Sequence, residues 1–455
     1  MKIILLLIIS SYIPSCLSVH NIVRYGAKPT DKQPPVEIAL ANTAAIISAI
    51  NAANEDSSDR VAYVPANETF YFSATYLENI HDVTFQIDGI LRAHDNITDW
   101  PKDSGGTGYD ELHFKNTTNV SIVGSGTIDG QGYIWWWDSI SMFLPGVTHN
   151  DRRGKMITFE ESTNVLIDGL TMINSPTWHI NFDDCDNVTV SNFYIWVNVT
   201  SQRDLLKSAG LFGKGDRVGL PTFPLNTDGI DPKASNVHIY NGVVENYDDG
   251  IVFKPCRKTS TYCKQCSGGY VHDLKVIFSV GLSIGSVPPN NDVNCVKDVV
   301  FKDIQMLDPL KGIYLKSNPG TSGTGLIQNI TYENIFLNRS LWWPIWIGPQ
   351  QQHQPGDGPG GGTGCSFIYP KHGSSCPTNP LVTFKDITLR NVTAIHGHND
   401  YPGALLGNVS NPFTGFVFDN VHVQEGKGQD YTLDFLVDNV YGVATNCTPA
   451  LTFLP

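Results

Sequence analysis

Two adjacent acids, Asp248 and Asp249, stand directly before an apolar stretch in the segment YDDGIVFKP at 247–255. A third acid, Asp228 in the segment NTDGID at 226–231, precedes Asp249 by 21 residues. Close carboxylates hold one another in different protonation states, because like charges disfavour simultaneous ionisation. Such a cluster supplies a proton donor and a proton acceptor together, as glycosidic-bond hydrolysis requires. Asp-Asp-Gly alone is also an ordinary polar turn, so this chemistry requires that the three acids meet in space.

The 21-residue interval equals one coil of a strand solenoid, which would place Asp228 and Asp249 on the same face. Along an ideal strand the side chains of Asp248 and Asp249 point to opposite sides. A bend is needed to turn both outward, and Gly250 permits one. We therefore expect the acids at a corner that faces a groove.

A weak internal repeat supports the solenoid, with a turn residue, an apolar/polar alternation, a small turn and a second alternation in each unit. The units are NVSIVGSGTIDG at 119, NVLIDGLTMIN at 164, NVTVSNFYIWV at 187, NVHIYNGVVEN at 236, DVVFKDIQMLD at 298, NITYENIFLN at 329 and DITLRNVTAI at 386. An antiparallel sandwich would need hairpin turns, and only Asn241-Gly242 has that form. We predict an all-β, single-domain, right-handed parallel β-helix with one short amphipathic helix over residues 37–53.

The N-terminus has the pattern of a secretory signal peptide, with one basic residue, a short apolar run and small residues near position 18. We predict a signal peptide over 1–18, a β-helix domain over 19–455 and a secreted, extracellular protein. No later stretch has eighteen uncharged apolar residues, so we predict no membrane anchor. Eleven Asn-x-Ser/Thr acceptors fit this route, although Asn also serves at strand corners.

Eight cysteines follow the signal segment, an even number that predicts disulfides in an oxidising compartment. Cys263 and Cys266 have the spacing of a zinc or redox pair, but export favours a structural bridge, so we predict no metal. The Gly/Pro segment 351–364 predicts a loop and lacks the Lys-Ser/Thr of a phosphate-binding loop. We therefore predict no cofactor.

The charge balance constrains the partners. With 30 basic and 44 acidic residues, the net charge of −14 argues against nucleic acid and anionic membranes. It does not exclude an acidic polysaccharide, because a local cleft can differ in charge from the whole chain. We predict a monomer.

Other candidates have structural alternatives. Trp135, Trp136 and Trp137 either stack on sugar rings or fill the core, as does the cluster LWWPIW at 341–346. His179 and His272 have no partner at a catalytic spacing, so we interpret both as structural. The segment 203–225 has no repeat character, and we expect it at a wall of the groove.

The order NTDG, DDG, GLSIGS at 281–286 and a Lys ending the short strand GIYLKS at 312–317 resembles the polygalacturonase family, glycoside hydrolase family 28. The opening NIVRYGAKPTDKQPP, the segment GTIDGQGYIWW at 126–136 and the segment NSPTWHI at 174–180 are similar to the same superfamily. The resemblance thus covers most of the chain after the signal segment. It implies a right-handed parallel β-helix that hydrolyses α-linked galacturonic acid chains in pectin with inversion.

The resemblance also implies roles for individual residues. Asp248 would be the general acid, while Asp228 and Asp249 would hold and activate water. Lys316 would bind a substrate carboxylate. Inversion leads us to expect about 6.5–9.5 Å between acid and base.

Three further residues are substrate-binding candidates. They are Tyr314, Lys254 and Asn226. Lys254 follows the paired acids by a few positions, where the alternation of a strand directs it either into the groove or away from it.

Two departures from the family pattern bear on the substrate. The family's usual Gly-His-Gly is replaced by Ser279-Val280-Gly281, and its usual Arg-Ile-Lys by Tyr314-Leu315-Lys316. A histidine and a cation are thereby lost. Alternatives to a galacturonan hydrolase are a rhamnogalacturonan hydrolase, an exo-acting pectin hydrolase, a polysaccharide lyase and a catalytically silent carbohydrate-binding β-helix.

Overall fold

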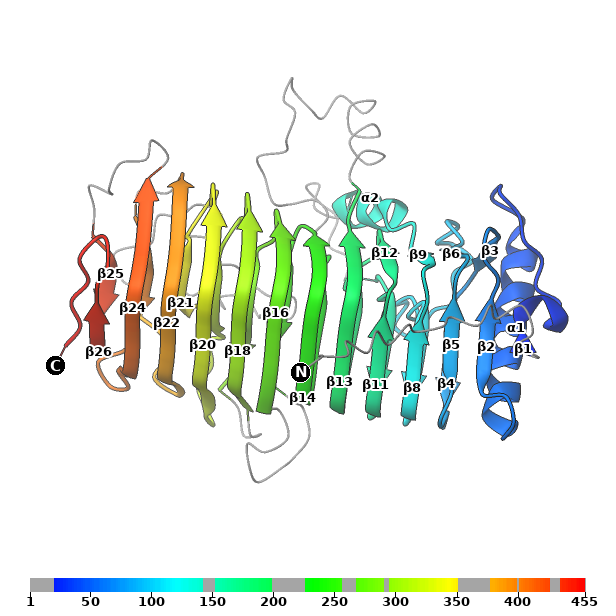
Figure 1. Cartoon of the computed structure of the whole chain (residues 1–455), viewed down its shortest axis with the longest axis horizontal. Coiled ribbons are helices and arrows are strands. Elements are labelled where there is room, and N and C mark those ends of the chain that lie inside the picture. The colour runs from blue at the N-terminus through cyan, green and yellow to red at the C-terminus, as the bar shows by residue number, and fades with distance from the viewer. Residues whose placement is uncertain are drawn as a thin grey trace, which may run out of the picture.

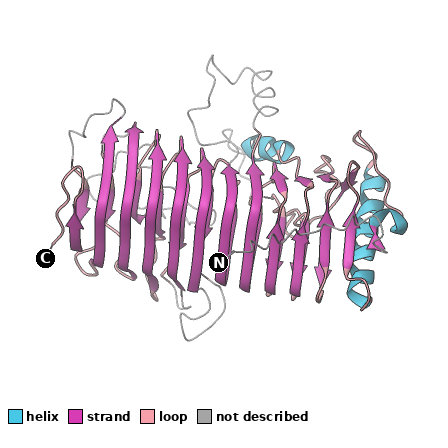
Figure 2. Cartoon of the chain, in the orientation of Figure 1, coloured by secondary structure: helices cyan, strands magenta, loops and turns pink. Residues whose placement is uncertain are grey.

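The computed structural model describes residues 20–141, 152–198, 226–255, 267–289, 294–350, 377–398, 401–425 and 434–454. Over these residues the chain winds into an elongated solenoid of strands, with helix α1 (Val36–Glu55) at one end and strand β26 (Val440–Thr445) at the other (Figure 1). Over the described residues all the pairings between these strands are parallel, and the helices lie in the N-terminal half of the solenoid (Figure 2). The right-handed parallel β-helix predicted from the repeats is confirmed.

The strands form three ladders along the solenoid. The first ladder, called the site face below, contains β4 (Thr75–Glu78), β7 (Leu112–Lys115), β10 (Ile157–Glu160), β15 (Asp249–Phe253), β17 (Gly281–Val287), β19 (Ile313–Ser317), β21 (Ile345–Pro349), β23 (Ala404–Leu406) and β25 (Leu436–Asp438). The second contains β1 (His20–Asn21), β2 (Val61–Val64), β5 (Thr84–Ile87), β8 (Thr118–Val123), β11 (Thr163–Asp168) and β26. The third contains β3 (Thr69–Phe72), β6 (Ile90–Ala93), β9 (Thr127–Asp129) and β12 (Thr171–Ile173).

Longer strands bend around corners and take part in more than one ladder. They are β13 (Ile180–Trp196), β14 (Ile230–Glu245), β16 (Ser267–Ile277), β18 (Asn294–Leu307), β20 (Gly325–Asn338), β22 (Val382–Gly397) and β24 (Phe413–Glu425). The first segments of β13 and β14 continue the site face, because Ile157 pairs with Ile180 and Ile180 with Ile230.

The repeat units stack in register, as expected. Val120, Val165, Val188 and Val237 occupy equivalent positions of successive coils and are all buried. Burial of one β-branched side chain per coil removes apolar surface from water along the whole tube. The core is therefore continuous along the axis.

Asparagines form the corners. Asn119, Asn164 and Asn187 have φ values of 57°, 56° and 55°, a left-handed conformation that Asn tolerates better than most residues. Asn164 Nδ2 donates to Asn119 Oδ1 at 2.8 Å, and Asn187 Nδ2 donates to Asn164 Oδ1 at 2.7 Å. Two of these acceptor-motif asparagines, Asn119 and Asn187, are thus corner residues.

Helix α1 confirms the helix predicted over 37–53 and extends it by a residue or two at each end. By length and composition alone it is the one described helix apolar enough to cross a membrane. Its residues Ile46, Ala49 and Ile50 are fully buried in the same core cluster as the strands, and it packs against β2 and β3. The helix therefore covers the end of the solenoid.

A 3₁₀ helix over Ile22–Tyr25 precedes α1, and a second α-helix, α2 (Tyr133–Ser141), was not predicted. In α2, Trp135 and Trp136 are buried, and Trp136 Nε1 donates to the carbonyl of Ser175 at 3.1 Å. The core interpretation of these two tryptophans is confirmed, whereas the side chain of Trp137 lies outside the described residues. Nine residues give too few helical periods for the pattern to be recognised.

The cysteines differ from the prediction. Cys295 is disulfide-bonded, but Cys185 and Cys447 are free. The prediction that the cysteines pair is wrong for these two. Cys185 is buried in the core, where its thiol donates to the carbonyl of Phe159 at 3.3 Å. Several predictions concern residues that the structure does not describe. They concern the remaining cysteines after the signal segment, the segments 203–225 and 351–364, and the signal segment 1–18.

Candidate active site

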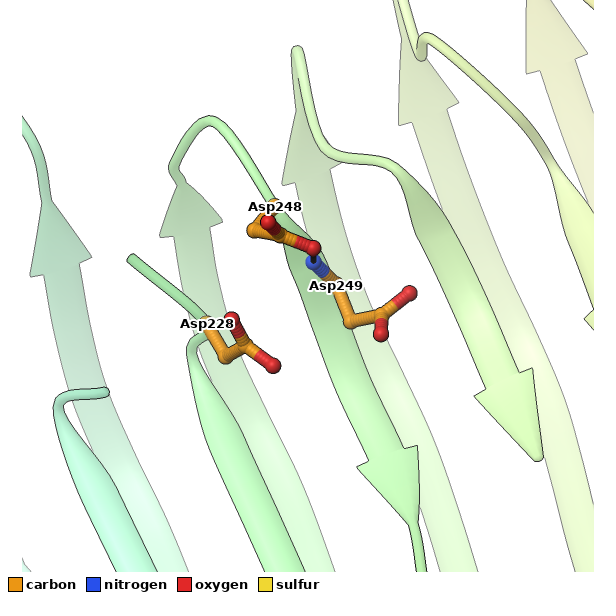
Figure 3. Close-up of side chains that lie close together, drawn as sticks. All are labelled: Asp228, Asp248 and Asp249. Atoms are coloured by element: carbon orange, nitrogen blue, oxygen red, sulfur yellow. Dashed lines mark hydrogen bonds between the residues drawn. The ribbon is translucent and has the colours of Figure 1, made fainter. Parts of the chain in front are cut away.

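The three aspartates meet on the site face. Asp228 lies just before β14, and Asp248 and Asp249 lie where β15 begins (Figure 3). Ile230 pairs with Ile251, so the 21-residue interval is one coil. One oxygen of each carboxylate lies within 4.8 Å of the other two. This approach is shorter than the separation of about 6.5–9.5 Å expected between acid and base. Asp248 and Asp249 are adjacent in sequence, and the stacking of coils about 4.8 Å apart brings Asp228 beside them.

A bend directs Asp248 and Asp249 to the same site. The register of β15 against β17 shifts between Asp249 and Ile251, so the regular alternation is broken at Gly250. The carbonyl of Asp248 accepts from the backbone N–H of Val280 and from the hydroxyl of Ser279, each at 2.8 Å. A Cβ at Gly250 would lie 2.8 Å from that hydroxyl, so a larger residue would displace the Ser279 side chain.

Asp249 is held as a carboxylate. Its Oδ2 accepts from Lys316 Nζ at 2.7 Å and its Oδ1 from the hydroxyl of Ser283 at 2.5 Å. Burial alone would raise its pKa, but the charges of Lys316 and Lys254 and these hydrogen bonds outweigh burial and lower the pKa. Asp249 is therefore ionised at mildly acidic pH.

The pKa of Asp248 shifts in the opposite direction, upward. Burial and then the charge of Asp249 raise its pKa, against the charge of Lys316 and two backbone hydrogen bonds. One comes from the N–H of Asn226 to Oδ2 at 3.0 Å. The other, drawn in Figure 3, comes from the N–H of Asp249 to Oδ1 at 2.9 Å. Asp248 is also more exposed than Asp228 and Asp249. It is thus the carboxyl best placed to meet substrate in its protonated form.

Asp228 is buried at the floor of the site. Burial, followed by the charges of Asp231 and Asp248, raises its pKa well above the ordinary value. Lys254 Nζ lies 3.6 Å from Asp228 Oδ2 and 2.5 Å from Asp231 Oδ2. Lys254 therefore faces the site.

His179 positions Asp228 through the backbone. Its Nδ1–H and its backbone N–H both reach the carbonyl of Asp228, at 3.0 and 2.9 Å, and Nε2 accepts weakly from Ser175 N–H at 3.4 Å. These contacts define the neutral tautomer, and burial lowers the pKa of His179 to about 4. The structural interpretation of His179 agrees with this arrangement, although the residue touches the site. His272 lies in the second ladder, hydrogen-bonded to His238 and Asp273.

The remaining predicted residues adjoin the aspartates. Lys316 is 4% exposed and paired with Asp249. Tyr314 is fully buried, so its ring forms a wall behind Lys316, whose Nζ lies 4.6 Å from the ring centroid. Asn226 adopts a left-handed φ of 60°, and its Oδ1 accepts from Arg153 at 3.2 Å. The role of these residues in binding substrate remains a prediction.

Val280 and Tyr314, which replace the family's histidine and arginine, share one apolar cluster with Trp343. Lys311, which the sequence analysis did not identify, is 2% exposed beside this cluster, with Nζ 3.8 Å from the Tyr314 ring centroid. Burial and then the charge of Lys316 lower the pKa of Lys311 well below its ordinary value. The amine of Lys311 therefore lies near the positions where the family has a histidine and an arginine.

The three carboxylates are spaced closely enough to hold a cation. The ammonium groups of Lys316 and Lys254 already lie against Asp249 and Asp228, so protein cations supply the counter-charge. This donor set fits acid–base chemistry without a metal.

Trp178, Lys155, Lys233 and Ser283 were also missed by the sequence analysis. Lys233 and Ser283 sit at outward positions of strands on the site face, and Trp178 and Lys155 lie just before its strands. Trp178 belongs to the NSPTWHI segment already noted. Alignment of the apolar positions of successive coils would have identified Lys233.

A solenoid face that holds an ionised carboxylate beside a carboxyl of raised pKa has the acid–base arrangement of a glycosidase. Residues 59–440 match the family described as Glycosyl hydrolases family 28. The chain belongs to this family.

Two relatives and one solved structure extend this match. The chain is 28% identical over 328 residues to a polygalacturonase of Cryptomeria japonica, covering 71% of this chain and 55% of that protein. It is 27% identical over 419 residues to a polygalacturonase of Chamaecyparis obtusa, covering 90% of this chain and 68% of that protein. The chain thus spans between half and about two thirds of their lengths. An endo-xylogalacturonan hydrolase from Aspergillus tubingensis shares the fold, with a TM-score of 0.68, 20% identity and coverage of 92% of this chain and 98% of that chain.

Proposed function

We propose that this protein hydrolyses α-linked galacturonic acid chains of pectin with inversion at the anomeric carbon. The observation that carries the proposal is the difference between two adjacent acids, Asp248 with a raised pKa and Asp249 with a lowered one. The names of its relatives, both polygalacturonases, support the substrate. The signal pattern over residues 1–18 supports export to the extracellular space, where such a polymer is found.

The mechanism assigns one step to each carboxyl. Asp248 donates its proton to the glycosidic oxygen as the bond to the anomeric carbon breaks. Water attacks that carbon from the opposite side and gives a proton to ionised Asp249. Asp228, whose pKa is raised by burial, orients the same water. After proton exchange with solvent, Asp248 and Asp249 return to their starting states.

The short spacing suits a bridging water. Two hydrogen bonds of about 2.8 Å from one water reach oxygens roughly 4.5 Å apart. The closest oxygens of Asp228 and Asp249 lie within 4.8 Å. A single water can therefore contact both carboxyls.

A second candidate substrate is rhamnogalacturonan. The observation that favours it is the apolar cluster at Val280 and Tyr314, where the family's histidine and arginine are absent. Lys311 restores a single amine at that position. We rank galacturonan first, because Lys316 and Lys254 place two ammonium groups at the site.

Release of reducing ends from homogalacturonan and from rhamnogalacturonan tests the proposal, with Asp248→Asn as the control. We expect release from homogalacturonan and a fall in kcat of about 10²–10⁴-fold in the variant, since a general acid contributes about this factor. The KM should change little. Release from rhamnogalacturonan alone would identify rhamnogalacturonan as the substrate in place of galacturonan. Release from neither, or an ultraviolet-absorbing unsaturated product, would overturn hydrolysis.

A further inference from the structure

Three lysines converge on one indole beside the aspartates. The Nζ atoms of Lys254, Lys155 and Lys233 lie 4.0, 5.3 and 5.6 Å from the ring centroid of Trp178. Each distance is within the range of a cation–π contact. The four residues come from four successive coils, next to β10, β13, β14 and β15.

This lysine–tryptophan cluster borders the acid–base site directly. Lys254 bridges the two, because its Nζ lies 3.6 Å from Asp228 Oδ2 and 4.0 Å from the Trp178 centroid. Lys155 lies before β10, two coils from the start of β14, so the cluster extends from Asp228 toward the N-terminal end of the solenoid. A chain bound along the site face would pass over it.

Lys155 carries the ammonium of the cluster that is most accessible to a ligand, because Lys254 Nζ already lies 2.5 Å from Asp231 Oδ2. Lys155 is the most exposed of the three lysines, with 29% of its side chain exposed, and Asp110 Oδ2 lies 3.9 Å away. That distance exceeds a hydrogen bond, so the ammonium of Lys155 can still donate to an incoming group. Lys233 is only 5% exposed, and its Nζ lies 3.5 Å from Asp183 Oδ2. The indole and the neighbouring carboxylates of Asp110, Asp183 and Asp231 keep the ammonium groups close together despite their repulsion.

We propose that Lys155, Lys233 and Lys254, arranged around Trp178, form a subsite for the carboxylate of a uronic acid unit adjoining the cleaved bond. The proposal deepens the proposed function and rests on it for the identity of the polymer. Three ammonium groups discriminate in favour of an ionised carboxylate. A neutral sugar or a methyl ester gives them no charge to bind.

Binding in the absence of turnover tests the subsite. Calorimetry would follow the binding of an α-linked galacturonate oligomer, and of its fully methyl-esterified form, to the Asp248→Asn variant. Adding Lys155→Met should weaken binding of the acid oligomer about tenfold, since a hydrogen bond to a charged group contributes about this factor. Binding of the ester should stay unchanged.

Lys115→Met is the matched control. Its side chain is also 29% exposed and lies on the site face, but its ammonium pairs with Glu160 at 2.8 Å and is not part of the cluster. This variant should bind both oligomers as the Asp248→Asn protein does. Equal weakening by both lysine substitutions would show a general charge effect and overturn the subsite.

Other outcomes separate the subsite from the reaction. Unchanged binding of the acid oligomer in the Lys155→Met variant, or equal loss for acid and ester, would overturn the subsite even if the enzyme hydrolyses galacturonan. Selective loss in an enzyme without hydrolysis would support the subsite and reject the proposed function. Failure to bind either oligomer would also overturn the subsite, whereas the reducing-end assay would still decide hydrolysis.

Discussion

At the residue scale, the environments of adjacent acids determine their protonation. Asp249 accepts hydrogen bonds from a hydroxyl and an ammonium. Asp248 accepts hydrogen bonds from two backbone N–H groups and lies beside the charge of Asp249. A bell-shaped dependence of rate on pH follows. The rate should fall as pH rises through the raised pKa of Asp248, and fall as pH drops through the lowered pKa of Asp249.

Replacing Ser283 by Ala should move the acidic limb of this profile. Its hydroxyl stabilises the ionised form of Asp249, so its loss raises the pKa of Asp249 and shifts the acidic limb upward by about one pH unit. The alkaline limb should change less. The measurement is kcat/KM against pH on galacturonan.

Ser317→Ala is a suitable control, because Ser317 is equally buried on β19 and its hydroxyl has no hydrogen-bond partner among the described residues. This control should retain the profile. An identical shift in both variants, or none in Ser283→Ala, would contradict the role given to Asp249.

At the scale of elements, corners set the register that builds the site. Each coil turns at an Asn or Asp of positive φ, and side-chain amides connect neighbouring corners. Because the corners are fixed, residues one coil apart, such as Ile230 and Ile251, are stacked. This stacking brings Asp228 close to Asp248 and Asp249.

Asn164→Ala should lower the free energy of unfolding by about 2 kcal/mol. The substitution removes two exposed hydrogen bonds and places a non-glycine side chain in the left-handed region without a local partner. Urea unfolding measures the loss. Asn164→Gly keeps the conformation accessible and should lose about half as much. Equal stability of the wild-type and Ala proteins would show that this ladder contributes nothing.

The sequence was sufficient to predict the solenoid and the aspartate cluster, because both depend on short repeats. The alternation in segments such as NVLIDGLTMIN specifies strands and turns locally, and the 21-residue interval specifies one coil. The surroundings of the site depend on register across coils of unequal length. Lys155 and Trp178 therefore could not be placed beside Lys254 from spacing alone.

Two errors have local physical causes. The even count of cysteines predicted disulfides, but Cys185 and Cys447 are free, and Cys185 is buried in the core. General carboxylate spacing for inversion overestimated the distance between acid and base, because the acid Asp248 and the base Asp249 are adjacent in sequence and turn to the same side. Neither the pairing of a cysteine nor the separation of two carboxylates can be derived from composition and general chemistry alone.

At the scale of the whole molecule, the solenoid provides one long face on which the acid–base residues and the proposed subsite lie in a row. The buried core and the α1 cap hold the coils parallel, so the row stays straight (Figure 1). Asp248, Asp249 and Asp228 occupy one position of the row, and the lysine–tryptophan cluster occupies the adjacent one. A linear polyanion matches this geometry better than a compact ligand.

The anomeric configuration of the first product tests the central claim most directly. Proton NMR during hydrolysis of an α-linked galacturonate oligomer would follow the newly formed reducing end before it equilibrates. A single displacement by water held at Asp228 and Asp249 predicts that the β-anomer appears first. Initial appearance of the α-anomer would require a covalent intermediate and would contradict the account.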